Sequence, residues 1–211
     1  SACDKAGTGR VAASLGPLNA SYRPDIFPAA DEAAEVYGEI VSHVKEHADI
    51  FLIETVTSVE HAEGALRATD GQGLPVWLAI STDDFDGTVL RSGEPLVDLA
   101  PVVAGHQVDA VLINCSRPEV VAEGLDIVKA LGKPFGAYAN GFTKISDGFK
   151  AEFPTVDALE ERKDLGPEAY AVFAMGWVGQ GASIVGGCCE VGPAHIAELA
   201  RQLREAGHIL V

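Results

Sequence analysis

The sequence predicts an α/β protein in which strands and helices alternate along the chain. Six short apolar runs rich in β-branched residues are separated by stretches with helical periodicity. No signal for an antiparallel hairpin stands between the runs, so we expect the strands to lie parallel to one another. A chain of 211 residues can bury one sizeable core, and we expect residues 1–211 to form a single domain.

The predicted strands are hydrophobic over nearly their whole length. This is typical of a parallel sheet that is covered on both faces, because neither side of such a strand meets water. The six predicted strands comprise residues 10–15, 49–53, 75–80, 109–113, 134–138 and 182–185.

The predicted helices begin with recognisable start signals. Ser58 is a good N-cap, and proline stands near the first turn of the last four helices, where its missing N–H costs nothing. Gly132 and Gly207 are typical helix stops. The six predicted helices comprise residues 30–47, 58–69, 95–106, 118–131, 167–179 and 193–206.

Six strand–helix units in a row fit either a doubly wound sheet or a barrel. A doubly wound sheet usually carries a G-x-G-x-x-G turn after its first strand, whereas that strand here ends Ser14-Leu15-Gly16-Pro17. We therefore favour a TIM (β/α)8-type barrel. Because six units are two short of closure, we expect the first two βα units to be lacking from this sequence.

Composition and charge exclude several classes of partner. The formal net charge is −16 and only 15 Lys and Arg are scattered along the chain, so no nucleic-acid partner is predicted. No apolar stretch approaches the roughly 18 residues that span a bilayer, so no membrane partner is predicted. The N-terminal residues show no signal peptide, which predicts a cytoplasmic protein.

Three of the four cysteines follow directly after predicted strands. Cys115 comes after the fourth strand, and Cys188 and Cys189 come after the sixth and a pair of glycines that allow close backbone approach. The C-terminal ends of barrel strands lie at one face, where active sites are found, so we expect these thiols to converge. Cys3 lies outside any strand end and is expected to be a small buried apolar residue.

Three converging thiolates suit a soft tetrahedral ion, and zinc is the leading candidate. Three protein ligands leave the fourth position open, which is the arrangement of a catalytic site. Three thiolates on a divalent ion leave a net charge of about −1, which favours holding one more thiolate over splitting water. The pattern therefore predicts a Zn²⁺ centre for sulfur alkylation.

Several motifs occur in an order that matches one known family. They are Ala13-Ser14-Leu15-Gly16-Pro17, Ile53-Glu54-Thr55, Asn114-Cys115, Tyr138-Ala139-Asn140, Gly186-Gly187-Cys188-Cys189 and Pro193-Ala194-His195-Ile196. Together they resemble the homocysteine S-methyltransferase family, which includes the betaine and S-methylmethionine enzymes and the homocysteine-binding module of cobalamin-dependent methionine synthase. The resemblance runs from about residue 11 to residue 196, and the Gly-Gly-Cys-Cys turn is its most specific part.

The resemblance implies a zinc-bearing eight-stranded barrel in which the three strand-end cysteines hold the metal. It implies methyl transfer from a small sulfonium or quaternary-amine donor to the zinc-activated thiolate of L-homocysteine, forming methionine. Glu54 matches the carboxylate that receives the amino group of the substrate, and Asn114 and Ser81 are further candidates for lining the pocket. No other catalytic residue is assigned.

Two departures from the family pattern keep alternatives open. The family's first two strands are absent, and Glu190-Val191-Gly192 replaces the usual continuation after the cysteines. If the missing strands are needed for activity, the polypeptide is instead a catalytically silent fragment or zinc-binding module. Its exposed sheet edges would then favour pairing with a second copy, in a homo-oligomer, or with another chain. Another thiol or a selenol as acceptor, and a doubly wound nucleotide-binding protein, are the remaining alternatives. The sequence does not name the methyl donor.

Other motifs are interpreted as structural. Residues 43–47 spell H-x-x-E-H, but they stand at a helix end on the face opposite the cysteines. Residues 83–87 resemble a calcium loop whose sixth position is Thr88 instead of glycine, so we expect an exposed loop above the site. His195, Trp77 and Trp177 are expected to be structural or core residues.

Overall fold

Six parallel strands form one sheet in the computed structural model, which describes residues 3, 5, 7–150 and 158–210. The strand order is β1-β2-β3-β4-β5-β6, so each strand pairs with its neighbours in sequence. All six predicted strands are present. They are β1 (Ala12–Leu15), β2 (Ile50–Val56), β3 (Val76–Ile80), β4 (Ala110–Asn114), β5 (Phe135–Tyr138) and β6 (Ile184–Val185).

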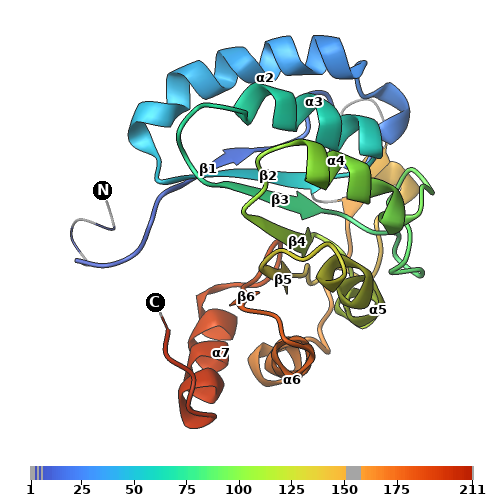
Figure 1. The fold of residues 1–211 in the computed structure, drawn as a ribbon. Coiled ribbons are helices and arrows are strands. Elements are labelled where there is room, and N and C mark those ends of the chain that lie inside the picture. Colours follow the sequence, from blue (N-terminus) through green and yellow to red (C-terminus); the bar gives the residue numbers. More distant parts are fainter. Residues whose placement is uncertain (1–2, 4, 6, 151–157, 211) are drawn as a thin grey trace.

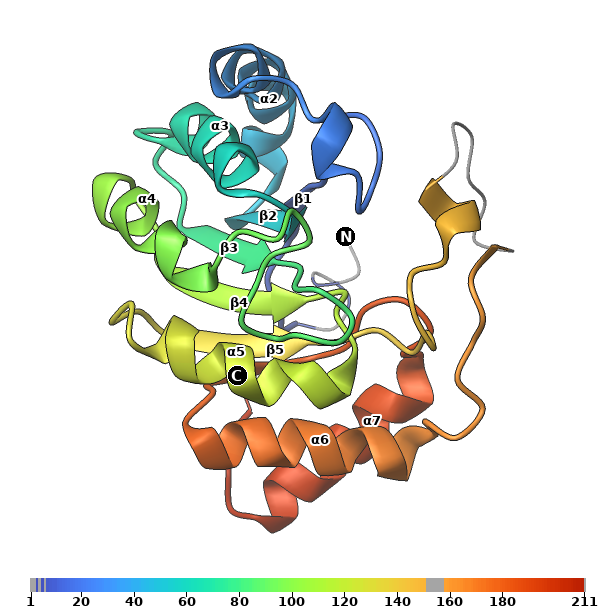
Figure 2. The ribbon, with the colours of Figure 1, turned by 90° about the vertical axis from the view of Figure 1, so that its right-hand side faces the viewer.

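Helices connect the strands and lie on the outer side of the curled sheet (Figures 1 and 2). They are α2 (Ala30–Val44), α3 (Val59–Thr69), α4 (Ala100–Gly105), α5 (Pro118–Lys129), α6 (Pro167–Gln180) and α7 (Pro193–Glu205). Short 3-10 helices in the described residues are η1 (Pro24–Ile26), η2 (Lys45–His47), η3 (Leu96–Leu99) and η4 (Asp147–Lys150). As predicted, Ser58 caps α3, its hydroxyl accepting a 3.1 Å hydrogen bond from the His61 N–H.

Two predicted helices differ from the observed ones. The helix expected at residues 30–47 is α for most of its length and ends in η2. The helix expected at residues 95–106 is η3 followed by the short α4. Pro101 stands in the first turn of α4, because an α-helix begun earlier would lose the hydrogen bond that this residue cannot donate.

The sheet is open between β1 and β6 in the described part of the chain, since those two strands do not pair with each other. The parallel α/β order is confirmed, whereas closure into a barrel is not seen. That two further βα units complete a barrel stays a prediction. No helix in the described residues has the length and hydrophobicity needed to cross a membrane.

The main core lies between the sheet and its helices. Phe51, Ile53 and Leu78 point from the strands into this layer and are fully buried, and Trp177 of α6 is 2% exposed, as predicted for a core residue. Trp77, also expected in the core, instead lies half-buried on the other, concave face of the sheet, at a hollow that Glu54 also lines. The outer layer therefore fixes the strands, and the concave face remains accessible.

The loop that joins β3 to η3, residues 81–95, rests against α5 through two glycines. A Cβ atom on Gly87 would overlap the carbonyl group of Val120, and one on Gly124 would lie 2.7 Å from the carbonyl oxygen of Gly87. Only glycine allows this approach of two backbones. The contact places the loop beside the C-terminal ends of the strands.

Candidate metal centre

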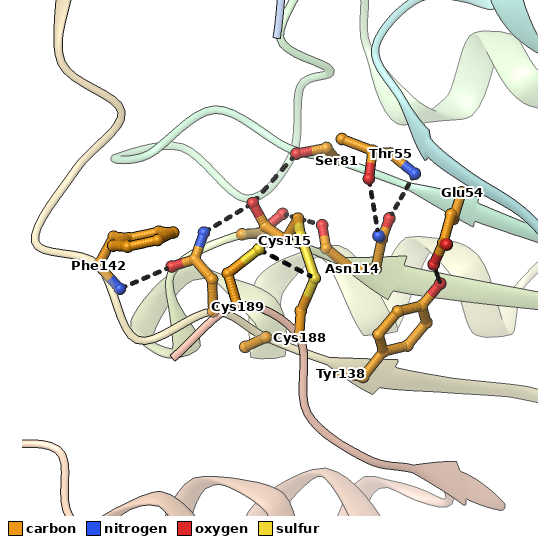
Figure 3. The surroundings of a disulfide bond; sticks show 12 residues. Glu54, Thr55, Ser81, Asn114, Cys115, Tyr138, Phe142, Cys188 and Cys189 are labelled. Atoms are coloured by element: carbon orange, nitrogen blue, oxygen red, sulfur yellow. Dashed lines mark hydrogen bonds between the residues drawn. A yellow bond between two sulfur atoms is a disulfide. The ribbon is translucent and has the colours of Figure 1, made fainter. Parts of the chain in front are cut away.

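Three cysteine sulfurs converge at the C-terminal ends of β4 and β6. The Sγ atoms of Cys115, Cys188 and Cys189 all lie within 4.8 Å of one another, the only such group of potential ligands within residues 3, 5, 7–150 and 158–210. Cys189 Sγ lies 3.9 Å from each of the other two sulfurs (Figure 3). The sequence-based prediction that strand ends bring these residues together agrees with this geometry.

Cys115 and Cys188 are joined by a disulfide, with their Cα atoms 5.7 Å apart, and Cys189 is free and exposed. The sequence predicts three thiolates that ligate one ion, and the structure differs, because the Gly186-Gly187 turn brings Cys188 within bonding reach of Cys115. A disulfide sulfur does not ligate a metal as a thiolate does. The three cysteines therefore form a metal site only after reduction.

The three sulfur atoms are placed suitably for a metal ion with tetrahedral thiolate coordination. A Zn–S bond of about 2.3 Å places two sulfur ligands roughly 3.8 Å apart along a tetrahedral edge. The two contacts that Cys189 makes, 3.9 Å each, match this edge. Once the disulfide is reduced, a small separation of Cys115 from Cys188 would complete the arrangement.

The backbone around the sulfurs is unusual. Cys115 has a φ of 46° and Glu190 a φ of 63°, and both values fall in the left-handed region that non-glycine residues rarely adopt. Such residues cost about 1–3 kcal/mol each and persist where surrounding contacts hold them, often at functional sites. A Cβ atom on Gly187 would overlap the side chain of Val191, so this turn requires glycine.

The carbonyl oxygen of Cys115 accepts three hydrogen bonds. The donors are Asn140 Nδ2 at 2.9 Å, Ser81 Oγ at 3.3 Å and Arg91 Nη2 at 3.4 Å. Ser81 and Asn140 are fully buried. The predicted pocket residue Ser81 is therefore engaged with the main chain of a candidate ligand.

Asn114 supports the neighbouring strand end. Its Oδ1 accepts a 2.9 Å hydrogen bond from the Thr55 N–H, and its Nδ2 donates a 3.0 Å hydrogen bond to Thr55 Oγ1 (Figure 3). Thr55 has a φ of 59°, and the β2–β3 register shifts between Ile53 and Val56. This bulge changes the direction in which the side chains at the end of β2 point. Asn114, which is fully buried, holds the segment that carries Glu54 in place.

Glu54 lies on the concave face, close to the sulfurs. Its carboxylate accepts hydrogen bonds from the Tyr138 hydroxyl, at 3.0 Å, and from the Ser14 hydroxyl. A hollow of about 330 Å³ adjoins it and is also lined by Trp77 and by Gly186. The predicted substrate carboxylate thus lies at one hollow with Gly186 and Gly187, the glycines that precede Cys188 and Cys189.

Burial raises the pKa of the Cys189 thiol, and the charges of Glu190 and Glu54 raise it further, although a backbone hydrogen bond opposes the effect. Burial also raises the pKa of Tyr138, and Glu54 adds to the increase. Tyr138 therefore remains protonated and donates to Glu54. A metal cation bound at the sulfurs would lower the pKa of Cys189 again, since a nearby positive charge favours the thiolate.

Several residues of this site were missing from the prediction. Tyr138 ends β5 just as Asn114 ends β4, so its position at a strand end was a usable signal. Asn140 follows two residues later. Arg91 and Asp84 lie in the loop after β3, where no periodicity marks a buried residue. Residues 83–87 of this loop were predicted to be exposed. The prediction is wrong for Asp84, whose side chain is only 8% exposed and pairs with Arg91.

The motifs that were set aside have structural surroundings. His195 Nδ1 accepts a 3.2 Å hydrogen bond from the Gly192 N–H, and its Nε2 lies 3.0 Å from the carbonyl oxygen of Leu165, so its structural role is confirmed. The histidines and glutamate of residues 43–47 are exposed, at the other end of the strands. Cys3 was expected to be buried, whereas it is a free cysteine of intermediate exposure.

The fold and the site define a parallel α/β protein with a three-cysteine centre at its strand ends. The family model described as homocysteine S-methyltransferase matches residues 1–203. The chain therefore belongs to the homocysteine S-methyltransferase family, as its motifs predicted.

Individual relatives agree with this assignment at low identity. The chain is 29% identical over 163 residues to homocysteine S-methyltransferase 4 of Zea mays, covering 75% of this chain and 45% of that protein. It is 27% identical over 207 residues to homocysteine S-methyltransferase YbgG of Bacillus subtilis (strain 168), covering 92% and 61%. The metallated form of the homocysteine methyltransferase MmuM from Escherichia coli superposes with a TM-score of 0.73 at 25% identity, covering 94% and 63%. The chain thus spans about half to two thirds of the length of these relatives.

Proposed function

We propose that this protein transfers a methyl group from a small sulfonium or quaternary-amine donor to the sulfur of L-homocysteine, forming methionine, with zinc as its metal. The observation that carries the proposal is the convergence of the sulfurs of Cys115, Cys188 and Cys189. The two glycines that precede Cys188 line a hollow that Glu54 also lines. Family membership supports the reaction class, and a relative solved in a metallated form supports the metal.

The three cysteines, once reduced, would hold the ion and leave one position for the acceptor sulfur. When bound, zinc lowers the pKa of an acceptor thiol and keeps its sulfur nucleophilic. The residues of the chain mainly position the substrate.

Glu54 would bind the ammonium group of L-homocysteine. Two hydroxyl donors, from Ser14 and Tyr138, hold the carboxylate from β1 and from β5. Because neither donor is a cation, neither would compete with the ammonium group of the substrate as a counter-ion. The hollow beside it leaves room for the amino acid.

Asn114 and Ser81 would contribute to the pocket wall by holding other groups. The amide of Asn114 is engaged with Thr55, and the hydroxyl of Ser81 with Cys115. Their side chains therefore fix the segment that carries Glu54 and the backbone of a metal ligand. Replacing either one would disturb substrate and metal binding indirectly.

The test begins with reduced protein that is loaded with zinc and freed of excess metal. We expect about one zinc per chain, the stoichiometry of one three-thiolate site. Methionine formation is then measured with S-methylmethionine, betaine and S-adenosylmethionine as donors, and with a selenol as a competing acceptor. Reduced protein that retains no zinc would overturn the metal assignment. Zinc retention with no methionine from any donor would overturn the reaction.

A further inference from the structure

Arg91 is a buried cation at the same end of the sheet as the cysteines. Its side chain is 6% exposed and forms an ion pair with Asp84, with 2.7 Å between Nη2 and Oδ1. Its Nε donates a 3.0 Å hydrogen bond to Ser81 Oγ, and its guanidinium carbon lies 4.7 Å from the centre of the Tyr22 ring. A buried arginine with this many partners is held in one orientation.

Through these contacts Arg91 joins loops that follow different strands. Tyr22 belongs to the loop after β1, and Ser81 and Asp84 follow β3. The second carboxylate oxygen of Asp84 accepts a 2.7 Å hydrogen bond from the N–H of Ile145, in the segment after β5. The same guanidinium that anchors these loops also reaches Cys115, which follows β4.

The contact with Cys115 is made to its main chain. Arg91 Nη2 lies 3.4 Å from the Cys115 carbonyl oxygen, and Ser81, which Arg91 also contacts, donates to the same oxygen. Cys115 has a φ of 46°, so its backbone adopts a conformation that surrounding contacts must hold. The direction of a side chain follows from the backbone that carries it, so fixing this carbonyl fixes the direction of the sulfur.

We propose that Arg91 is a positioning residue for the metal centre. Anchored by Asp84, its guanidinium holds the carbonyl of Cys115 and thereby directs the Cys115 sulfur toward Cys188 and Cys189. The inference rests on the proposed function in taking these three cysteines as metal ligands. Arginine suits the role better than lysine, because its planar fork serves Asp84, Ser81 and Cys115 at once.

Arg91→Met and Arg91→Lys test the proposal against a control, Arg162→Met. Arg162 is a matched residue, since it is 12% exposed and its side chain pairs with Glu119 and Asp164 instead of a cysteine or Ser81. Zinc affinity is measured on reduced protein by competition with a chelator. Cadmium–thiolate absorption then counts the sulfur ligands, and thermal unfolding records stability separately.

Arg91→Met is expected to lower zinc affinity about tenfold or more, the usual effect of removing a group that orients a ligand. Its cadmium–thiolate absorption should fall by up to a third, because the Cys115 sulfur is held less firmly at the ion. Arg91→Lys should lie between Arg91→Met and the wild type, and the control should stay within about twofold of the wild type. A role confined to loop stability would lower the unfolding temperature and leave affinity and absorption unchanged, which would overturn the proposal. If Arg91→Met does not fold, Arg91→Lys decides on the same two measurements.

A second measurement needs no metal. Oxidised glutathione takes two electrons from the Cys115 and Cys188 thiols, so that one protein disulfide and two glutathione thiols form. Arg91→Met should shift this equilibrium about tenfold toward the reduced protein, because the Cys115 sulfur is no longer aimed at its partner. An unchanged equilibrium contradicts the positioning role. A wild-type protein that binds no zinc contradicts the proposed function instead, so the two failures are distinguishable.

Discussion

Tyr138 donates a 3.0 Å hydrogen bond to a carboxylate oxygen of Glu54, although β3 and β4 lie between the strands that carry them (Figure 3). The sheet is curved enough for side chains of β2 and β5 to meet on its concave side. Ser14 of β1 donates to the other carboxylate oxygen. The position of the Glu54 carboxylate therefore depends on residues of three strands, β1, β2 and β5.

Tyr138→Phe should weaken homocysteine binding. A hydrogen bond to a charged group contributes roughly 1.5–3 kcal/mol, so the KM for homocysteine should rise about tenfold or more with a smaller change in kcat. Steady-state kinetics with homocysteine varied would show this. Tyr37→Phe is the control, because Tyr37 belongs to α2 and its hydroxyl contacts the Gly16 carbonyl and His61 instead of Glu54, so its loss should mainly lower stability. Equal KM values for Tyr138→Phe and the wild type would exclude Tyr138 as the residue that orients Glu54.

Cys189→Ala should abolish tight zinc binding, whereas Cys3→Ala should not affect it. Cys189 is 3.9 Å from both other sulfurs, and Cys3 lies near Gly9, in the N-terminal segment before β1. Loss of one of three thiolates should cost at least about 100-fold in affinity, more than the loss of an orienting group. Metal content after dialysis, with thiols counted under denaturing conditions, compares the two variants. A similar loss in Cys3→Ala would place the metal elsewhere.

Zinc loading should depend on a reductant. With Cys115 and Cys188 joined, two of the three sulfurs are not thiolates, so oxidised protein should take up little zinc and reduced protein about one equivalent. Addition of zinc to the reduced protein should in turn slow its oxidation by glutathione disulfide. Equal zinc uptake by both forms would show that the metal does not use Cys115 and Cys188.

His61 should make the protein sensitive to acid. Its side chain is fully buried between Tyr37 and Phe27, and burial lowers the pKa of His61 to about 3. Below pH 6.5 the imidazole of His61 is protonated in the unfolded chain but stays neutral in the folded protein. The free energy of unfolding therefore falls by about 1.4 kcal/mol per pH unit, until the pH approaches the pKa of His61 in the folded protein. Urea unfolding of His61→Gln at pH 7.5 and pH 5.0 should show a loss about 2 kcal/mol smaller than in wild type. The exposed His208, changed to Gln, should leave the wild-type loss intact.

His106 should have the opposite effect on the pH dependence of stability, since it should stabilise the protein at low pH. Burial alone would lower its pKa, but hydrogen bonds to Asp70, at 2.6 Å, and to Glu63, at 3.2 Å, outweigh that effect and leave the pKa of His106 above its ordinary value. The stabilisation is therefore complete below pH 6.5 and is lost as the pH rises through the folded pKa. His106→Gln should be less stable than wild type at pH 6 and similar at pH 9. Equal stabilities at pH 6 would show that these contacts contribute nothing.

Local sequence predicts most of this fold. The buried strands are continuous apolar runs, and the helix starts carry proline or a capping serine, so both are visible without tertiary information. The extension of β2 to Val56 was missed, because Glu54-Thr55 interrupts the apolar run and pairing with β3 restores the strand. Closure of the sheet depends on contacts between distant segments, and local patterns carry little information about them.

The candidate site divides in the same way. The three cysteines were predicted because parallel strands end at a common edge, a rule that needs only strand positions. The Cys115–Cys188 bond, the Asn140 contact and the Arg91–Asp84 pair were not predicted. Each arises where loops from separate strands meet, and their separation in sequence carries no periodic signal.

The meeting of Gly87 with Gly124 has a consequence for how relatives of this protein can diverge. A methyl group at either position would force residues 81–95 and α5 apart, and Arg91, which contacts Cys115, belongs to that loop. Both glycines should therefore be retained in orthologues that keep this arginine, and lineages that have lost the arginine should tolerate alanine at both.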